Sequence, residues 1–197
     1  ACLRQWDSFP SDSAIAVLDA YLASGTDGLP AIQLAAQSAD VSVRVAAWQA
    51  LGKLAVPSAA ISLVCKAAAH GDAGERASAR EALVLMHGTG VREALLSHIE
   101  NAEQPEKVEL LRALGERVDT TAADALLLNA ASGSGPVRLA ALESLRKLAV
   151  PKTLVPLFDI AAKLQAEDES EAAVKAIGAV CQSSGDKDKA TRSVLAA

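Results

Sequence analysis

The sequence has few aromatic residues, few cysteines and no long apolar run. Aromatic residues make up 3% of the 197 residues, and the apolar content is mostly Ala, Leu and Val. Small side chains let helices approach closely, which favours stacked helix pairs over one large globular core. No apolar run reaches the roughly 18 residues that indicate a membrane-spanning helix. We therefore expect no membrane span.

Residues that could carry metal or redox chemistry are also scarce. Cys2, Cys65 and Cys181 have no CxxC spacing, so we expect no disulfide framework and interpret the last two as small buried apolar residues. The histidines are His70, His87 and His98. They have no second ligand one helical turn away, and the sequence contains no P-loop, GxGxxG or GxSxG motif. The sequence therefore predicts a protein that is not an enzyme, with no catalytic residue, no metal site and no cofactor.

What the sequence does contain is a repeat. Residues 43–57 read VRVAAWQALGKLAVP and residues 137–151 read VRLAALESLRKLAVP, with ten of fifteen positions identical. An apolar residue recurs between and beyond these copies at steps of 29 to 32 residues, at Leu22, Leu51, Leu83, Leu114, Leu145 and Ile177. Such a period indicates an array of helix pairs that stack to bury a shared core.

The pattern predicts an all-α solenoid of about six antiparallel helix pairs that form one array over residues 1–197. The expected units are 11–39, 40–71, 72–103, 104–134, 135–167 and 168–197. Residues 1–10 are interpreted as the remnant of a preceding helix or a cap. Both ends fall within helical patterns, so we expect the chain to be a piece of a longer protein.

The first helix of each unit reads acid-x-x-V-R-x-x-A-x-x-A-L-G-x-L, best seen from Asp40 to Leu54 and again from Pro136 to Leu148. This pattern resembles HEAT repeats, and most closely the short bacterial type first described in phycobilisome lyases. The resemblance covers nearly all of the chain, although the first and sixth units lack the basic residue. It implies an armadillo-like right-handed superhelix, and it says almost nothing about function because the family includes many unrelated binding proteins.

A basic residue occupies one equivalent position in consecutive units, at Arg44, Arg76, Lys107 and Arg138. These cations could follow a phosphate backbone, or they could form a structural charge ladder. An acid precedes the first three by four residues, which is the helical spacing of an ion pair. Similar HEAT proteins use such groups to tie neighbouring repeats. We therefore favour the structural interpretation.

The second helices carry small and polar residues at the period of the array. In HEAT superhelices these helices line the concave side, so they predict a surface for a protein or peptide partner, centred on units two to four. The residues of this expected surface are Gln33, Gln37, Ser62, Lys66, Glu93, Ser97, Asn129 and Lys163. The sequence predicts a non-enzymatic protein-interaction, scaffold or spacer module, which we expect to be a monomer.

Two other functions remain open at this stage. One is a nucleic-acid-binding HEAT protein similar to alkyl-base DNA glycosylases, which the net charge of −5 disfavours. The other is a protein similar to bilin lyases, for which the sequence offers no identifiable pocket. No targeting signal indicates a compartment, so cytoplasmic and exported locations both stay open.

Overall fold

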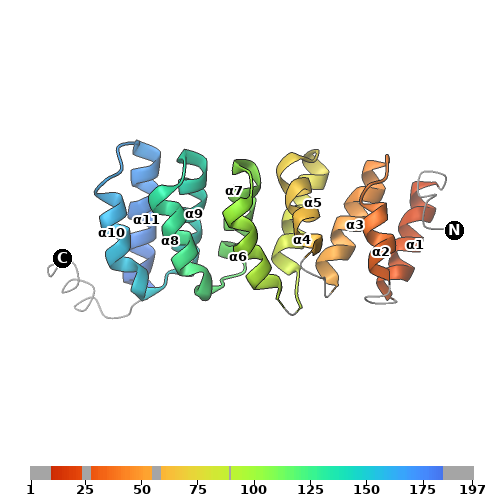
Figure 1. Ribbon diagram of the computed structural model, residues 1–197, viewed down its shortest axis with the longest axis horizontal. Helices are drawn as coiled ribbons and strands as arrows, with labels where there is room; N and C mark the ends of the chain where they lie inside the picture. The colour runs from red at the N-terminus through yellow and green to blue at the C-terminus, as the bar shows by residue number, and fades with distance from the viewer. Residues whose placement is uncertain (1–9, 24–27, 55–58, 89, 184–197) are drawn as a thin grey trace. The chain divides into compact units, whose positions relative to one another are not determined.

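The computed structural model describes residues 10–23, 28–54, 59–88 and 90–183, and its elements there are all helices (Figure 1). The α-helices are α1 (Ser11–Ala23), α2 (Leu29–Ala35), α3 (Val41–Lys53), α4 (Ala59–His70), α5 (Ala73–Leu85), α6 (Val91–Asn101), α7 (Gln104–Glu116), α8 (Ala123–Ser132), α9 (Gly135–Leu148), α10 (Leu154–Ala161) and α11 (Glu167–Ser183). Short 3₁₀ helices precede α8 and α10: η4 (Thr120–Ala122) and η5 (Pro151–Thr153). The expectation of an all-α fold is confirmed. None of these helices is long and apolar enough to cross a membrane.

The chain divides into two compact units, Ala1–Glu109 and Leu110–Ala197. The boundary falls within α7, and therefore within the segment 104–134 that the sequence pattern treats as one repeat. Residues 1–9 of the expected remnant or cap and residues 184–197 of the expected sixth unit lie outside the described residues.

In the first unit, helices of like position in the repeat pack in succession. Helix α3 packs on α1 and on α5, while α2 lies against α1 and α3, and α4 lies against α5 and α6. The core between them consists of fully buried aliphatic side chains, among them Leu18, Ile32, Leu51, Ile61, Leu83 and Leu95.

The second unit has the same plan. Helix α9 packs on α8 and α11, and α10 lies against α8 and α11. Its fully buried side chains include Leu110, Leu111, Leu114, Leu126 and Leu142. A helix with an apolar stripe buries it only by packing against neighbouring helices, as these helices do.

The recurring apolar position lies at the centre of this packing. Leu51, Leu83, Leu114 and Leu145 are all 0% exposed, whereas Leu22 and Ile177, the outermost copies, are only half-buried. The period in the sequence therefore marks the residues that are buried between successive helices.

Aspartate residues begin the first helices of two repeats. Asp40 accepts hydrogen bonds from the backbone N–H groups of Ser42 (2.7 Å) and Val43 (3.4 Å). Asp72 accepts from Gly74 and Glu75, both at 3.1 Å. The Glu75 side chain in turn accepts from the Asp72 N–H at 3.2 Å, which completes a capping box. These bonds satisfy N–H groups that have no partner within the helix.

Candidate functional site

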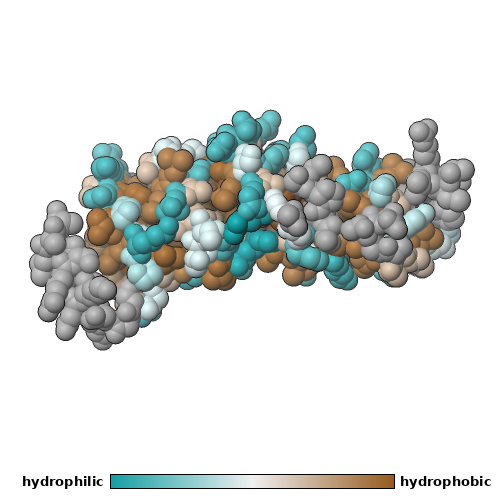
Figure 2. Space-filling model, turned by 60° about the horizontal axis from the view of Figure 1, so that its bottom comes forward, coloured by the Kyte–Doolittle hydropathy of each residue, from teal (hydrophilic) through white to brown (hydrophobic). Residues whose placement is uncertain are grey.

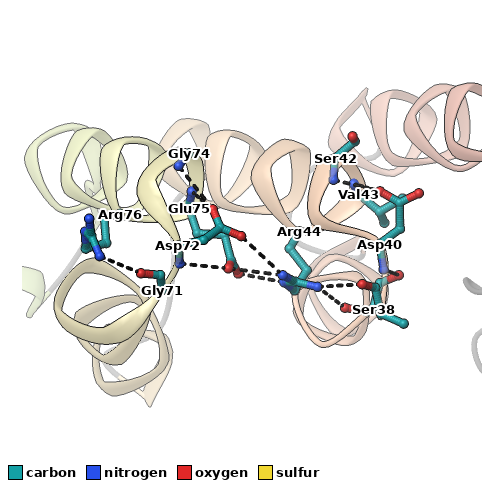
Figure 3. A network of polar contacts seen from close by, with 11 residues as sticks. Ser38, Asp40, Ser42, Val43, Arg44, Gly71, Asp72, Gly74, Glu75 and Arg76 are labelled. Carbon is teal, nitrogen blue, oxygen red and sulfur yellow. Dashed lines mark hydrogen bonds and ion pairs between the residues drawn. The ribbon is translucent and has the colours of Figure 1, made fainter.

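Arg44 on α3 is the centre of a polar network that reaches α5 (Figure 3). Its Nε and Nη2 atoms donate to the two carboxylate oxygens of Glu75 at 2.7 and 3.1 Å. Its Nη1 atom donates to the carbonyl oxygens of Ser38 and Ala39, both at 2.8 Å. Nη2 also lies 3.6 Å from Asp72 Oδ2. One guanidinium thus links the residues that follow α2 to the first turn of α5.

The electrostatics of this pair follow from its geometry. The hydrogen bonds from Arg44 lower the pKa of Glu75 to about 2, and burial of the carboxylate opposes this shift only in part. The same bonds raise the pKa of Arg44. Glu75 is only 8% exposed, so its charge depends on the partner that the fold supplies.

The second unit repeats this arrangement. Arg138 Nη1 on α9 donates to Glu169 Oε2 on α11 at 2.7 Å, and its Nε donates to the Ala130 carbonyl oxygen at 3.0 Å. Both ion pairs join residues that are 31 apart in the chain.

A further pair, from Arg80 to Glu109, joins α5 to α7 through two bonds of 2.7 Å and raises the pKa of Arg80.

The other two members of the predicted charge ladder lie differently. Arg76 Nη1 donates to the Gly71 carbonyl oxygen at 3.0 Å, at the turn before its own helix. Lys107 is half-buried and makes no ion pair with any residue that the structure describes. The sequence pattern indicated the acids four residues before the first three cations, and it did not identify Glu75 and Glu169 as the partners of Arg44 and Arg138. Their recurrence 31 residues after a ladder arginine is the signal that could have revealed them.

The predicted partner surface in the first unit consists largely of solvated polar groups. Gln37, in the turn after α2, is exposed, and its Nε2 donates to the Gln33 carbonyl oxygen at 3.5 Å. Glu93 pairs with its neighbour Arg92 at 2.6 Å. The remaining residues are half-buried or exposed: Ser62, Lys66 and Ser97.

In the second unit, the two predicted residues have different surroundings. Asn129 Nδ2 donates to the Ala125 carbonyl oxygen at 2.8 Å, so its amide is engaged on its own helix. Lys163, just after α10, lines a cleft instead. The structure thus places one member of the expected surface at a concave site and leaves Asn129 bonded within α8.

This cleft lies between α8 and α10 and has a volume of about 780 Å³. Its apolar lining comes from Leu127, Leu128, Ala131, Pro156, Ile160 and Leu164. Leu128 is 66% exposed, the most exposed large apolar residue among those described. On the face that Figure 2 presents, apolar and polar residues are interspersed over both units.

The ion pair between Arg138 and Glu169 also lines the cleft, and the exposed side chains of Asp159 and Lys163 lie on its α10 side. A concave apolar surface with a few charged groups can bind an apolar partner and fix its orientation. The residues predicted for the partner surface do not include Pro156 and Ile160, because the apolar groove forms only where α8 and α10 meet.

The histidines and cysteines that the structure describes form no comparable site. His70 and His98 place their Nε2 atoms 4.0 and 3.8 Å from the two oxygens of the buried Glu106 carboxylate. Within the described parts of the chain, no group of three or more His, Cys, Asp or Glu residues is arranged to hold a metal ion. Burial raises the pKa of the Cys65 thiol to about 12, with smaller contributions from Glu106 and Glu109. The Cys65 thiol therefore stays protonated at neutral pH, which does not suit a nucleophile.

Comparisons with known proteins do not assign a family. No family model matches the sequence, and no curated protein matches it. One solved structure similar to this chain is an engineered protein from the Northeast Structural Genomics Consortium. The match has 18% identity, a TM-score of 0.44, and covers 91% of this chain and 87% of the other. A likeness of this size carries no argument about family or function.

Proposed function

We propose that this chain is a HEAT-like right-handed α-solenoid of antiparallel helix pairs that acts as a non-enzymatic interaction module. Its partner is a protein or peptide, bound on the second helices of a unit: α2, α4 and α6 in the first unit, or α8 and α10 in the second. The repeat interpretation is supported by the sequence period and by the equivalent ion pairs of Arg44 and Arg138, each with an acid 31 residues later.

The observation that carries the binding proposal is the cleft between α8 and α10. Both are second helices, so this is the face where the sequence pattern places a partner. The cleft exposes apolar surface, above all Leu128 at 66% exposure. Exposed apolar surface in a concave site costs free energy in water, and a partner that covers it removes that cost.

The charges favour a polypeptide over a nucleic acid. The chain has a net charge of −5, and the guanidinium groups of Arg44, Arg80 and Arg138 each pair with a carboxylate. Cations already neutralised within the fold contribute little to attraction of a phosphate backbone.

A selection from a library of random linear peptides tests the proposal. The full chain is the target, and clones are compared on Leu128→Asp, on the double variant Lys66→Glu/Ser97→Arg, and on Val174→Asp. Val174 on α11 is 64% exposed and does not line the cleft, so it is the matched control. We expect enriched peptides that lose binding on Leu128→Asp and keep it on Val174→Asp.

The double variant locates binding in the first unit, where Lys66 and Ser97 are exposed. Peptides sensitive to it alone would place the partner on α4 and α6, within the proposed face. If no library yields a clone sensitive to either set of changes, the binding function is wrong and a passive spacer becomes the better account.

A further inference from the structure

The helical walls of the α8–α10 cleft offer few uncharged hydrogen-bonding groups, and the amide of Gln165, which follows α10, also lines the cleft. Its α8 side consists of Leu127, Leu128 and Ala131. The polar side chains of the same helix are already engaged, because Asn129 donates to the Ala125 carbonyl oxygen and Ser132 donates to the Leu128 carbonyl oxygen, both at 2.8 Å. The backbone groups within α8 and α10 are largely hydrogen-bonded along their own helices, whereas Leu164, Gln165 and Ala166 line the cleft from the segment after α10.

This lining discriminates between conformations of a bound polypeptide. An extended segment in an apolar groove buries backbone N–H and C=O groups that find no partner, and each such buried group weakens binding. A helical segment satisfies those groups internally and presents only side chains to the groove. The chemistry of the walls therefore favours a helix as the occupant.

The charged groups of the cleft can set the orientation of a bound helix. Arg138 and Glu169 neutralise each other at 2.7 Å. Asp159 and Lys163, four residues apart, are exposed, and neither side chain forms an ion pair with any residue in the described ranges. One free carboxylate and one free ammonium thus lie beside the apolar surface of Pro156 and Ile160.

We propose that the cleft binds an amphipathic helix of a partner protein, an inference that rests on the proposed function. The helix packs apolar side chains, spaced three and four residues apart, between α8 and α10 against Leu128 and Ile160. A basic residue on its flank pairs with Asp159 and an acidic residue pairs with Lys163, which fixes the polarity of the helix in the groove.

A second peptide library, compared with the linear one, tests whether the occupant of the cleft is a helix. It displays a single helix-forming scaffold with one face randomised, and it is selected on the full chain in parallel with the linear peptides. We expect the helical library to enrich Leu, Ile, Phe or Met at helical spacing. Affinity, measured by fluorescence anisotropy of the selected peptides, falls about tenfold or more on Leu128→Asp, as for loss of a central apolar contact. On Val174→Asp it stays unchanged.

The charge pattern has its own test. The double variant Asp159→Lys/Lys163→Asp exchanges the two signs without changing the apolar surface. Peptides selected on the original chain should bind it more weakly, and peptides with the exchanged flanking charges should recover the affinity. Equal binding of both peptide sets to both proteins overturns the assignment of these two residues.

The outcomes separate this inference from the function on which it rests. If only linear, proline-containing peptides are enriched and they depend on Leu128, the cleft binds a polypeptide but not a helix. If Leu128→Asp converts a self-associated form into a monomer in sedimentation experiments, the occupant is a second copy of this chain. If neither library yields a dependent clone, both the inference and the proposed function are wrong.

Discussion

Gly115 on α7 lies directly against Ser144 on α9, so closely that a methyl group on the glycine would stand 2.8 Å from the Ser144 Cα atom. Ser144 is 2% exposed, and its hydroxyl donates to the Leu111 carbonyl oxygen at 2.9 Å. In the first unit, a methyl group on Gly52 would meet the Ala82 Cα atom at 2.9 Å. Each glycine follows a recurring leucine, Leu51 or Leu114. The glycine in the repeat motif is therefore a helix-contact residue.

Gly115→Ala should destabilise the protein by about 1–3 kcal/mol, the usual cost of forcing an extra carbon into a packed contact. The atoms that it meets belong partly to the backbone, so a change of rotamer cannot relieve the clash. Urea unfolding measures the change.

The control is Gly178→Ala on α11, where the added methyl group meets nothing within 4 Å. There the higher helix propensity of alanine should stabilise the protein by roughly 0.5–1 kcal/mol. Equal effects of the two substitutions would contradict the close approach of α7 and α9.

Leu145→Ala should lower the free energy of unfolding by about 2–5 kcal/mol, because the side chain is 0% exposed and its removal leaves a cavity. Leu85→Ala is the matched substitution at a side chain that is 49% exposed, and it should change stability by less than about 0.5 kcal/mol. Thermal denaturation that ranks the two variants in the opposite order would rule out Leu145 as a core position of the repeat.

Arg44→Gln should lower stability at neutral pH by about 1.5–3 kcal/mol, the range for hydrogen bonds to a charged partner. The pKa of Glu75 is about 2 in the folded protein, against about 4.3 in an unfolded chain. A lowered folded pKa contributes stability above the unfolded value, and that contribution disappears as the pH falls toward 2. The difference in unfolding free energy between the original protein and the variant should therefore be largest above about pH 4.5 and decrease below it.

Chemical denaturation at several pH values checks this dependence. Lys175→Gln is the control, because Lys175 pairs with Glu171 at 2.7 Å while both side chains are at least 60% exposed. It should change stability by less than about 0.5 kcal/mol. A difference for Arg44→Gln that stays constant down to pH 2 would show that the arginine acts through packing alone.

Val118→Gly should stabilise the protein by about 0.5–1 kcal/mol, since left-handed backbone costs roughly 1–2 kcal/mol for an L residue with a side chain. Val118 has φ 51° and is 58% exposed. It follows α7, where the N–H groups of Asp119 and Val118 bond to the carbonyl oxygens of Leu114 and Gly115 at 3.4 and 3.2 Å. Glycine is the usual residue at this position of a helix C-terminus.

A Val→Gly substitution within a helix should instead destabilise the protein. Val174, in α11, is 64% exposed, and Val174→Gly there should cost about 0.5–1 kcal/mol. Calorimetry on both variants decides the matter, and a lower melting temperature for Val118→Gly would refute the backbone argument.

Much of the helical framework could be predicted because it depends on local and periodic information. The spacing of Leu51, Leu83, Leu114 and Leu145 identified residues that are completely buried, since a helix with one apolar stripe must bury it. The caps that Asp40 and Asp72 form are local in the same way, because capping involves only the next few backbone N–H groups.

Contacts between helices could not be predicted from the sequence pattern. The acids four residues before Arg44 and Arg76 stood at ion-pair spacing, yet Asp40 and Asp72 accept hydrogen bonds from backbone N–H groups. The guanidinium of Arg44 instead crosses to Glu75 on α5. The α8–α10 cleft likewise forms only because packing brings Leu128 and Ile160 to one groove. The sequence by itself determined which residues are helical and which face of each helix is buried, because both follow from periodicity. Only the tertiary structure decided which charges pair and where apolar surface stays exposed, because both depend on which helices become neighbours.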